Sequence, residues 1–439
     1  MKLSGWGRFP RVESRLALAR TQDDAVRAVT GGRTLIARGN GRAYGDAAVN
    51  PHATVSMLGM GRMLAFDPAD GALTCEAGVL LKDILDVFVP RGWFPPVTPG
   101  TKMVTVGGMI AADVHGKNHH IAGSFGDHVL SLDLLLADGR VVTCGPDRDP
   151  ELFAATRGGM GLTGVILRAT FRLIPVETGY IRQETLRAEN LDVIMAMFEE
   201  SADWTYSVAW IDCLARGPRM GRSLLFRGEH ARVDELPVPV RSAPLDVRLR
   251  HARTIPLDFP AFALNHWSVG AFNELYWRMG TPRETLIDYD RFFYPLDSLL
   301  EWNRIYGRPG FTQYQCVLPA SVSAAGLRAL LTAIGSAGNA SFLAVLKLFG
   351  RQDGVMSFPM EGYTLALDFP ASSATFGLLL DLDAIVADHG GRLYLAKDAR
   401  MGAGLLRRGY PALDGFQALR AARGLDRVFR SVQSERLAI

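Results

Sequence analysis

Short apolar runs alternate with turn-forming residues along the first third of the chain. Each run ends beside a glycine, a proline or an Asp-Gly pair, as strands closed by turns do; the runs cover residues 34–37, 73–77, 132–136 and 165–173. Two segments between them, 23–29 and 80–89, repeat apolar residues at helical spacing. The pattern predicts small βα units of the α+β class.

The pattern changes from about residue 178 onward. Aromatic residues become frequent, and strand-like runs at 342–349 and 363–369 are flanked by segments of helical period. We interpret this part as a second domain, a sheet backed by helices. Residues 392–439 fit either domain by pattern alone. A chain of 439 residues is too long for one ordinary compact core, so two domains are expected.

Composition narrows the class of protein. Apolar residues make up 48%, charged residues 21%, and the net charge is +3, which indicates a globular protein without a nucleic-acid footprint. The four cysteines include no CxxC pair, so neither a zinc site nor a disulfide framework is expected. The N-terminus lacks a signal-peptide pattern, and no apolar run approaches the roughly 18 residues of a transmembrane helix. We expect a cytoplasmic protein, with contact to a membrane surface left open.

A first glycine-rich segment follows the run at 34–37 and reads RGNGRAYGD from Arg38 to Asp46. Its glycine spacing is one residue longer than the dinucleotide fingerprint, and no helical pattern follows, which argues against a Rossmann turn. Glycines here allow consecutive backbone N–H groups to face an anion. A tight structural loop explains the same pattern, and both interpretations remain open at this point.

A literal GxGxxG motif runs from Gly159 to Gly164, but its context is reversed. A helix-like segment at 151–156 precedes it and a strand-like run at 165–173 follows it. A Rossmann site requires a strand, a turn and then a helix whose N-terminus meets the pyrophosphate. We therefore predict no Rossmann site and no NAD here.

A third segment, residues 99–120, reads PGTKMVTVGGMIAADVHGKNHH. Its glycines precede a short apolar run, and the backbone N–H groups of residues 105–108 are predicted to hold a pyrophosphate with no side chain in the way. A polar cluster follows, predicted to form an active-site rim: His115, Lys117, His119 and His120.

A metal-binding interpretation of this cluster has to be weighed. His115 and His119 are four residues apart, the spacing of two ligands on one helix face. Gly116 disfavours a helix, which removes the geometry that this spacing requires. We predict no metal; structural histidines remain the alternative to an active-site rim.

Together these segments resemble the FAD-binding domain of vanillyl-alcohol-oxidase-type (PCMH-type) flavoproteins, and more narrowly the decaprenylphosphoryl-β-D-ribose 2′-oxidase family. The resemblance is carried by GWGRFP, ARGNGRAYGD, PGTKMVTVGGMIAADVHGKNHHIAGSFGDHV and ELFAATRGGMGLTGVILRAT. It continues through YSVAWID, FFYPLDSLLEWNRIYGRPGFTQYQCVLP, FLAVLKLFG and GGRLYLAKDAR, and so covers nearly the whole chain.

The resemblance implies a two-domain α+β fold with non-covalent FAD. An FAD-binding domain would cover 1–177, a substrate domain with an antiparallel sheet backed by helices 178–391, and a C-terminal segment, 392–439, would return to the first domain. The implied FAD contacts are Ala37, Arg38, Gly39, Asn40, Gly41, Arg42, Ala43, Tyr44, Gly45, Asp46, Ala47, Gly100, Thr105, Val106, Gly107, Gly108, Ala112, Asp113, Val114, His115, Ile166 and Tyr394. The implied substrate contacts are Lys117, Asp297, Gln313, Gln315, Lys347 and Lys397, beside Tyr44 and His115.

Alcohol oxidation by a flavin needs a C–H bond over flavin N5, an acceptor for the hydroxyl proton and stabilised charge on the reduced ring. Lys397, in an otherwise apolar run, is the predicted catalytic cation, and burial would lower its pKa so that it also accepts a proton. His115 is predicted to orient the ring or the hydroxyl, and Tyr44 to hydrogen-bond at the pocket mouth. A surface lysine and a core tyrosine are the alternatives.

Two strand-like segments are predicted to face the substrate. Gln313 and Gln315 alternate in FTQYQCV, which points both side chains to one face and suits sugar hydroxyls. Lys347 lies between two leucines and is predicted to meet a phosphate as a point charge. An ordinary alternating strand is the alternative for Lys347.

The chain departs from the family pattern at three pocket positions. Ala366 stands where the family has a cysteine, Thr364 where it has an asparagine, and Phe293 where it has a tyrosine, with Tyr294 shifted by one place. Hydride transfer does not need the cysteine, so the chemistry is expected to survive. The substitutions leave the exact substrate open.

We therefore predict an FAD-dependent oxidoreductase that oxidises a secondary alcohol of a sugar. The resemblance implies the 2′-hydroxyl of a polyprenyl-phosphoryl ribose, oxidised to the 2-keto sugar as the first half of an epimerisation towards an arabinose donor for cell-wall arabinan. It also implies a short-chain reductase as partner protein. The alternatives are an FAD oxidase of another sugar or alcohol, and a non-catalytic lipid-phosphate-binding homologue, against which the presence of Lys117 and Lys397 argues.

Overall fold

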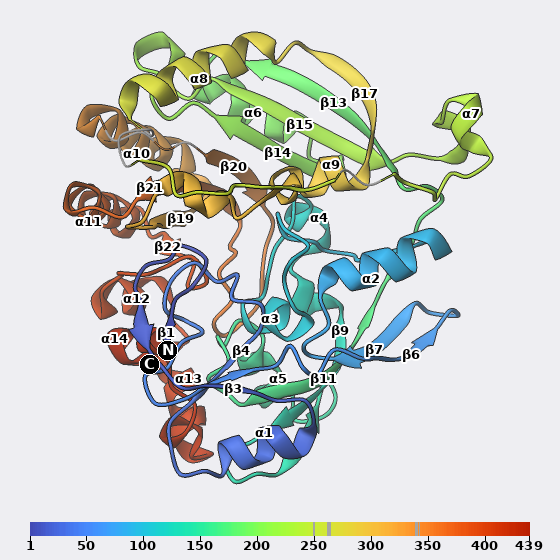
Figure 1. Cartoon of the computed structure of the whole chain (residues 1–439). Helices are drawn as coiled ribbons and strands as arrows, with labels where there is room; N and C mark the ends of the chain where they lie inside the picture. The colour runs from blue at the N-terminus through green and yellow to red at the C-terminus, as the bar shows by residue number, and fades with distance from the viewer. Residues whose placement is uncertain (249–250, 261–264, 339–340, 342) are drawn as a thin grey trace.

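The computed structural model describes residues 1–248, 251–260, 265–338, 341 and 343–439. Figure 1 shows them as two bodies, with the N-terminal part and the C-terminal helices below and a large sheet with its helices above. Helices and mainly antiparallel sheets are mixed throughout, which confirms the α+β class.

The lower body contains two sheets. Three parallel strands are β3 (Leu16–Leu18), β5 (Thr54–Ser56) and β4 (Ile36–Arg38). Five antiparallel strands follow in the order β10 (Val141–Cys144), β9 (Val129–Leu135), β11 (Val165–Arg172), β7 (Ala72–Glu76) and β6 (Met63–Asp67). The helices include α1 (Gln22–Val29), α2 (Leu81–Phe88) and α5 (Pro150–Thr156). The strands and helices predicted in this part are confirmed, with bounds shifted by a few residues at most.

Local sequence explains these helices. The Thr21 hydroxyl and the Asp24 carboxylate form a capping box that starts α1. α2 buries Leu81, Ile84 and Leu85 at helical spacing against the core. Short strand pairs complete the lower body and its border: β1 (Lys2–Leu3) with β2 (Val12–Glu13), and β8 (Trp93–Phe94) with β12 (Ile174–Pro175). The short helix α7 (Val238–Arg241) projects at the side of the upper body (Figure 1).

The upper body is built on one antiparallel sheet of eight strands. Their order is β17 (Arg283–Asp288), β13 (Tyr180–Ala188), β15 (Ser223–His230), β14 (Tyr206–Ile211), β20 (Ala344–Phe349), β21 (Gly362–Pro370), β19 (Phe311–Pro319) and β22 (Arg392–Leu393). Helices α6 (Leu191–Glu200), α10 (Ser323–Ala337) and α11 (Ser373–Asp388) pack against it. The predicted strand at 363–369 is confirmed; that at 342–349 begins at Ala344, and residue 342 lies outside the described residues.

On the face of this sheet opposite α6, α10 and α11, two helices cover one half and the lower body meets the other half. α8 (His266–Met279) covers Trp210 and Leu224, and α9 (Tyr289–Phe293) lies over Gly228. Trp210 is the register partner of Val345, and Val345 that of Ala366, so the same face continues across β20, β21 and β19 towards the lower body. The half of the sheet that meets the lower body therefore lies beside α8 and α9.

The C-terminal segment contacts both bodies. β22 extends the large sheet beside β19, and α12 (Ala403–Gly409), α13 (Leu413–Ala422) and α14 (Val432–Leu437) then lie in the lower body (Figure 1). Leu35 donates its N–H to the Val428 carbonyl at 2.8 Å, and Arg430 donates to the Leu35 carbonyl at 2.9 Å. The chain thus crosses the junction a second time near its end.

One helical stretch among the described residues, Ala320–Ala337, has the length and composition of a membrane-crossing helix. It contains α10, which packs against α11 and β19. Core helices of this kind meet the same criteria, so the finding is a weak indication of a span.

Candidate active site

A cavity of about 340 Å³ lies where the large sheet meets the glycine-rich loops of the lower body. It is lined by these predicted site residues: Ala37, Arg38, Gly39, Asn40, Gly41, Arg42, Ala43, Tyr44, Ala47, Gly100, Thr105, Gly107, Gly108, Ala112, Val114, His115, Ile166, Asp297, Gln313, Gln315, Lys347, Tyr394 and Lys397. Five predicted residues are not among its lining: Gly45, Asp46, Val106, Asp113 and Lys117. The fold therefore brings most of the predicted set together around one space.

The loop after β4 supplies backbone donors to this cavity. A Cβ at Gly39 would lie 2.1 Å from the Thr105 hydroxyl oxygen, so only glycine allows the loop to approach α3 (Val106–Ala111) so closely. The Asn40 side chain donates to the Met103 carbonyl at 2.8 Å and holds the loop in place. Within the described part of the chain, the N–H groups of residues 39–43 have no protein acceptor. This arrangement favours an anion-binding loop over a purely structural one.

The backbone N–H groups of residues 105–108 were predicted to face a pyrophosphate, but most of them have partners within the protein. Val106 donates its N–H to the Val79 carbonyl at 2.9 Å, Gly107 to Ala77 at 2.8 Å, and Gly108 to the Thr105 hydroxyl at 3.2 Å. The N–H groups of residues 106–108 are therefore already paired and are not free to hold a pyrophosphate, whereas the prediction for the Thr105 N–H is not contradicted. The glycines serve close packing instead: a Cβ at Gly107 would lie 2.9 Å from that of Ala77.

Four of the predicted site residues that do not line the cavity make contacts within the protein instead. Both oxygens of the buried Asp46 carboxylate accept from Arg436 on α14, at 2.8 and 3.1 Å. Asp113 accepts from the Ser124 hydroxyl at 2.6 Å, and from Ser357. Val106 is buried in the core, and Gly45 lies against the Asp398 carbonyl, where a Cβ would approach within 2.0 Å. These positions shape the cavity walls from behind.

The GxGxxG motif lies between a helix and a strand, in the order that the sequence predicted. α5 precedes it and β11 follows it, so no strand–turn–helix unit is formed. Gly161 and Gly164 nevertheless line the cavity. The motif therefore contributes small residues to the cavity wall. It does not direct a helix N-terminus at a phosphate.

His115 is held as a neutral imidazole. The Gln315 side-chain amide donates to the Thr364 hydroxyl at 3.3 Å and to His115 Nε2 at 3.0 Å. Nε2 therefore accepts, and the ring hydrogen sits on Nδ1, which has no partner among the described residues. Burial lowers the pKa of His115 well below its usual value, and the charge of Lys347 adds to this. His115 can donate one hydrogen bond from Nδ1.

The neighbouring histidines are engaged in the fold. His119 starts α4 (His119–Ala122), and its Nε2 lies 2.9 Å from the Gln352 side-chain oxygen; burial lowers its pKa to about 4. His120 Nε2 lies 2.9 Å from the Trp204 carbonyl. No group of three His, Cys, Asp or Glu residues that would hold a metal occurs in the described ranges. His119 and His120 thus follow the structural alternative.

Two lysines, Lys347 and Lys397, line the upper end of the cavity, and a third, Lys117, lies outside its lining. Burial lowers the pKa of Lys117 to about 7, with a further contribution from Lys347; its amine donates to the Phe292 carbonyl and lies 4.0 Å from the Phe292 ring centroid. Burial lowers the pKa of Lys347 to about 8. The Lys397 amine lies 3.6 Å from the Tyr44 ring centroid. Three adjacent cations attract a dianionic group and ease loss of a proton from one of them.

Asp368 is the main residue that the sequence analysis missed. It is fully buried on β21, and the Gln313 amide donates to its Oδ1 at 2.5 Å. Burial raises the pKa of Asp368, while Lys397 opposes this; burial lowers the pKa of Lys397, while Asp368 opposes that. The alternation of β21 placed Asp368 on the same face as Thr364 and Ala366, which was a usable signal.

The structure also shows the hydrogen bonds of Asp297 and the places of two residues that depart from the family pattern. Both oxygens of Asp297 accept from the loop below, from the Thr101 hydroxyl at 2.7 Å and the Lys102 N–H at 2.8 Å. Ala366 lines the cavity, whereas Phe293 is buried against Phe94 with ring centroids 5.2 Å apart. Asp297 therefore ties the upper body to the loop and has little capacity left for a ligand.

The lower cavity fits a flavin nucleotide. Its walls of glycine and alanine leave backbone amides open, and the Tyr394 hydroxyl donates to the Ala112 carbonyl at 2.8 Å, which fixes an aromatic ring in the wall. Arg42 is stacked 3.9 Å from the Trp6 ring centroid, and its buried Nε has no partner among the described residues. A cation beside unpaired amides suits a diphosphate.

Comparison with known proteins gives an independent line of support. Residues 14–145 match the FAD binding domain family. The whole chain is 40% identical to decaprenylphosphoryl-β-D-ribose oxidase of Mycolicibacterium smegmatis, covering 97% of that protein. It is 37% identical to an uncharacterised Streptomyces coelicolor protein over 82% of this chain and all of that one. L-gulonolactone oxidase of Mus musculus is 32% identical over 40% of this chain and 39% of its own length.

Proposed function

Because the chain belongs to the decaprenylphosphoryl-β-D-ribose oxidase family and is an FAD-dependent oxidoreductase acting on CH–OH groups, we propose that it oxidises the 2′-hydroxyl of a polyprenyl-phosphoryl ribose to the 2-keto sugar. One observation carries this proposal: Lys347, Lys397, two same-face glutamines and a neutral histidine line the sheet end of a cavity whose other end fits FAD. The FAD is proposed to bind without a covalent link.

FAD, when bound, supplies a two-electron hydride acceptor to this site. Lys397 is the proposed acceptor of the hydroxyl proton at its amine, because burial favours the neutral form and Asp368 is positioned to attract the resulting charge. Tyr44 holds that amine over its ring at 3.6 Å. His115 is proposed to orient the flavin ring or the substrate hydroxyl as a neutral imidazole that the Gln315 amide holds in place.

The remaining contacts are proposed to orient the sugar. Gln313 and Gln315 point from β19 into the cavity, and their amides are fixed by Asp368 and Thr364 respectively. Lys347 is proposed to bind the phosphate, with Lys117 behind it raising the local positive potential. Asp297 is proposed to contact the substrate only through the loop that it braces.

The division of the chain is also proposed. Residues 1–177 would hold FAD, residues 178–391 would hold the sugar, and residues 392–439 would return to the first domain. The pairing of Leu35 with residues 428 and 430, and of Asp46 with Arg436, supports the last part. The keto product would pass to a short-chain reductase partner that completes an epimerisation towards an arabinose donor.

Oxidation of another sugar or alcohol is the second candidate. Ala366 lines the cavity at a position where the sequence departs from the family pattern, and L-gulonolactone oxidase is similar over part of the chain. Anaerobic titration separates the two: polyprenyl-phosphoryl ribose should bleach the visible flavin absorbance, and free sugars or lactones should not. Bleaching by the free compounds alone would favour the second candidate. A non-catalytic homologue would show no bleaching with any of them.

A further inference from the structure

Arg436 on α14 binds two segments that are far apart in the sequence and meet at the cavity. Its Nε and Nη2 donate to the two oxygens of Asp46, at 3.1 and 2.8 Å, on the loop after β4. Nη2 also donates to Asp398 at 2.8 Å, and Nη1 donates to the Met401 carbonyl at 2.5 Å. Asp398 follows Lys397 directly in the chain. One guanidinium group therefore joins the predicted FAD-binding loop to the turn that carries the proposed catalytic lysine.

The loop after β4 and the Lys397 turn, residues 394–398, also contact each other directly. The Tyr44 N–H donates to the Ala396 carbonyl at 2.8 Å, and a Cβ at Gly45 would approach within 2.0 Å of the Asp398 carbonyl oxygen. The Lys397 amine lies 3.6 Å from the Tyr44 ring centroid. Because the two segments are in contact, a displacement of either one would move the Lys397 amine relative to the cavity wall that the loop forms.

The Arg436 guanidinium lies between two buried carboxylates. The side chains of Asp46 and Asp398 are 1% and 2% exposed, and that of Arg436 is 24% exposed. Burial raises the pKa of Asp46, and Arg436 opposes this. Burial disfavours the charge of Arg436, yet the two carboxylates raise its pKa above the usual value. Without the guanidinium, two buried like charges would be left uncompensated beside each other, which would drive the two segments apart.

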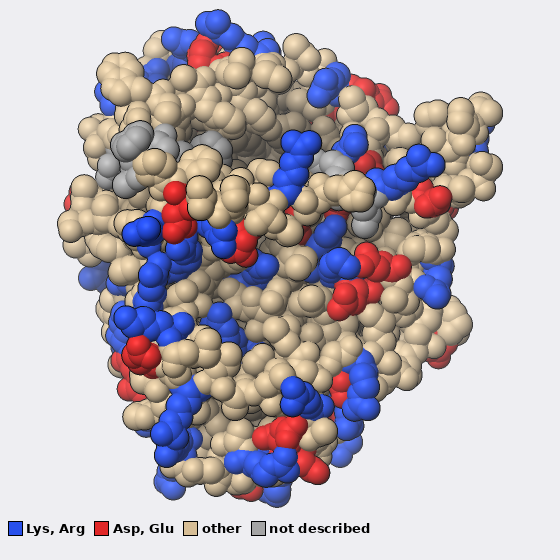
Figure 2. Space-filling view, viewed as in Figure 1, with Lys and Arg blue, Asp and Glu red and all other residues tan. Residues whose placement is uncertain are grey.

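Arg436 differs from the exposed basic side chains around it. Figure 2 shows Lys and Arg side chains over the side of the lower body where α12 and α14 lie in Figure 1. Arg407 on α12 pairs with Asp414, and their side chains are 58% and 79% exposed. Exposed pairs of this kind hold their partners weakly. A guanidinium that contacts two buried carboxylates fixes the position of both.

We propose that Arg436 is a positioning residue for the oxidation, which holds the Lys397 amine in place against the loop that binds FAD. The inference rests on the proposed function, in which Lys397 accepts the hydroxyl proton. Gln433 on α14 supports the same turn, because its side-chain amide donates to the Leu395 carbonyl at 2.7 Å. Arg436 does not line the cavity. Its loss should therefore slow the chemical step and leave the affinity for the sugar nearly unchanged.

Single-turnover flavin reduction separates positioning from stability. Each protein is saturated with FAD and mixed anaerobically with polyprenyl-phosphoryl ribose, and the rate constant and amplitude of bleaching are recorded. Arg436→Met should lower the rate constant at saturating substrate at least about tenfold. The substrate dissociation constant should change less than about twofold. A residue that only stabilised the fold would lower the amplitude, because less protein is folded, and would leave the rate constant unchanged.

FAD binding gives a second readout that needs no substrate. In Arg436→Met the loop after β4 loses its anchor at Asp46 and has to be ordered when FAD binds. The FAD dissociation constant, measured by flavin fluorescence, should therefore rise at least about threefold. Arg436→Lys keeps a positive charge but lacks the planar fork that meets both carboxylates, so its rate constant should lie between those of the wild type and Arg436→Met.

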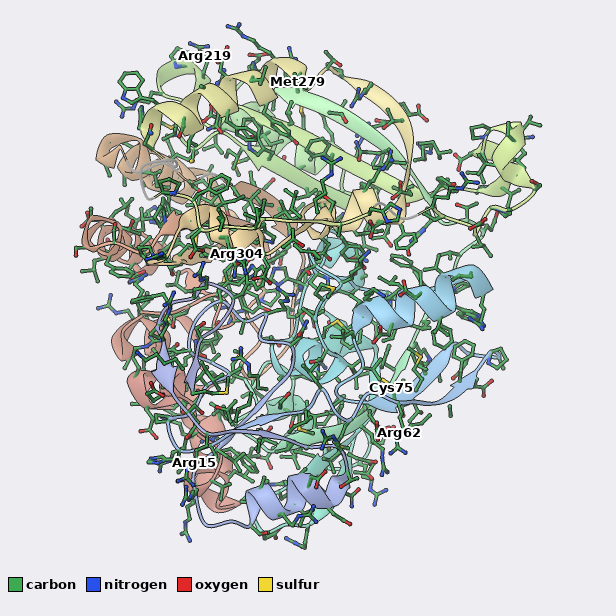
Figure 3. All side chains as sticks on the ribbon, in the orientation of Figure 1. Arg15, Arg62, Cys75, Arg219, Met279 and Arg304 are labelled. Atoms are coloured by element: carbon green, nitrogen blue, oxygen red, sulfur yellow. The ribbon has the colours of Figure 1, made fainter. Side chains whose placement is uncertain are left out.

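Two control variants remove a guanidinium from a carboxylate elsewhere in the lower body. Arg423 contacts Asp149 through two nitrogens at 2.6 and 2.8 Å, and both side chains are 30% exposed. Arg62 pairs with the buried Glu76 at 2.7 Å, and Figure 3 labels it on the side of the lower body opposite α14. Arg423→Met and Arg62→Met should both reduce flavin with the wild-type rate constant.

The outcomes are distinct from those that test the substrate. A wild-type rate constant or an unchanged FAD dissociation constant in Arg436→Met would overturn the positioning role, and Arg436→Lys decides in the same way if Arg436→Met does not fold. An equal loss of rate in the two control variants would overturn it as well, because general loosening of the lower body would then explain the loss. If another alcohol bleaches the wild-type flavin and polyprenyl-phosphoryl ribose does not, only the proposed substrate fails, and the variants are compared with that alcohol.

Discussion

Lys347→Met should weaken binding of a phosphate-bearing substrate most at neutral pH and progressively less at alkaline pH. Burial lowers the pKa of Lys347 to about 8, so roughly 90% of the protein carries this charge at pH 7 and roughly 10% at pH 9. A hydrogen bond between charged groups contributes about 1.5–3 kcal/mol, which corresponds to a loss of affinity of roughly 10- to 150-fold when it is removed. The variant should show the full loss near pH 7.

The sign of the pH dependence follows from the direction of the shift. The folded protein holds the proton on Lys347 less tightly than an unfolded chain does, and the cation that binds phosphate disappears as the pH rises through about 8. The wild-type KM should therefore rise by roughly ninefold between pH 7 and pH 9, while the KM of the variant lacks this component. Titration of Lys117 and Lys397 affects both proteins, so the ratio of the two KM values isolates Lys347.

The assay is the initial rate of flavin-dependent oxidation with polyprenyl-phosphoryl ribose at several pH values, for the wild type and Lys347→Met. Lys82→Met is the matched control, because Lys82 is an exposed lysine paired with Asp86 on α2 at 2.5 Å, away from the cavity. It should leave KM unchanged at every pH. A KM ratio for Lys347→Met that stays constant from pH 7 to pH 9, or stays near one, would refute the phosphate-binding role.

Three further predictions concern catalysis and the cofactor. Lys397→Met should retain FAD but slow flavin reduction in stopped-flow experiments at least about tenfold; a wild-type rate would remove the amine from the mechanism. Asp368→Asn removes a carboxylate that raises the pKa of Lys397, so the acid limb of the pH–rate profile should move to lower pH, and a shift to higher pH would contradict the pairing. Gly39→Ala places a Cβ 2.1 Å from the Thr105 hydroxyl oxygen, and it should weaken FAD binding at least about tenfold in a fluorescence titration. The control variant Gly404→Ala adds a Cβ in open space and should leave FAD binding unchanged.

Alternating patterns in the sequence predicted the sheet side of the cavity well. Gln313 and Gln315 line it together because they are two residues apart on β19, and Lys347 lines it from β20. The same rule would have found Asp368, two residues after Ala366 on β21. Strand geometry is local, so side-chain direction can be read from spacing alone.

Non-local pairings were out of reach of the sequence. The amides of Val106 and Gly107 are taken by carbonyls of residues 79 and 77, a pairing that depends on how α3 packs beside β7. Asp46 is bound by Arg436, which is 390 positions away. Trp6 lines the cavity from the N-terminus, and no spacing links it to the loop that it covers. Such contacts are set by tertiary packing and carry no periodic signal.

The most direct test of the account is an anaerobic titration of the purified, FAD-loaded protein with polyprenyl-phosphoryl ribose, followed by visible absorbance. We expect the flavin bands to bleach with one equivalent of substrate and a 2-keto sugar to appear in the same amount. Flavin bands that remain unchanged at saturating substrate, in protein that binds FAD, would contradict the proposed oxidation.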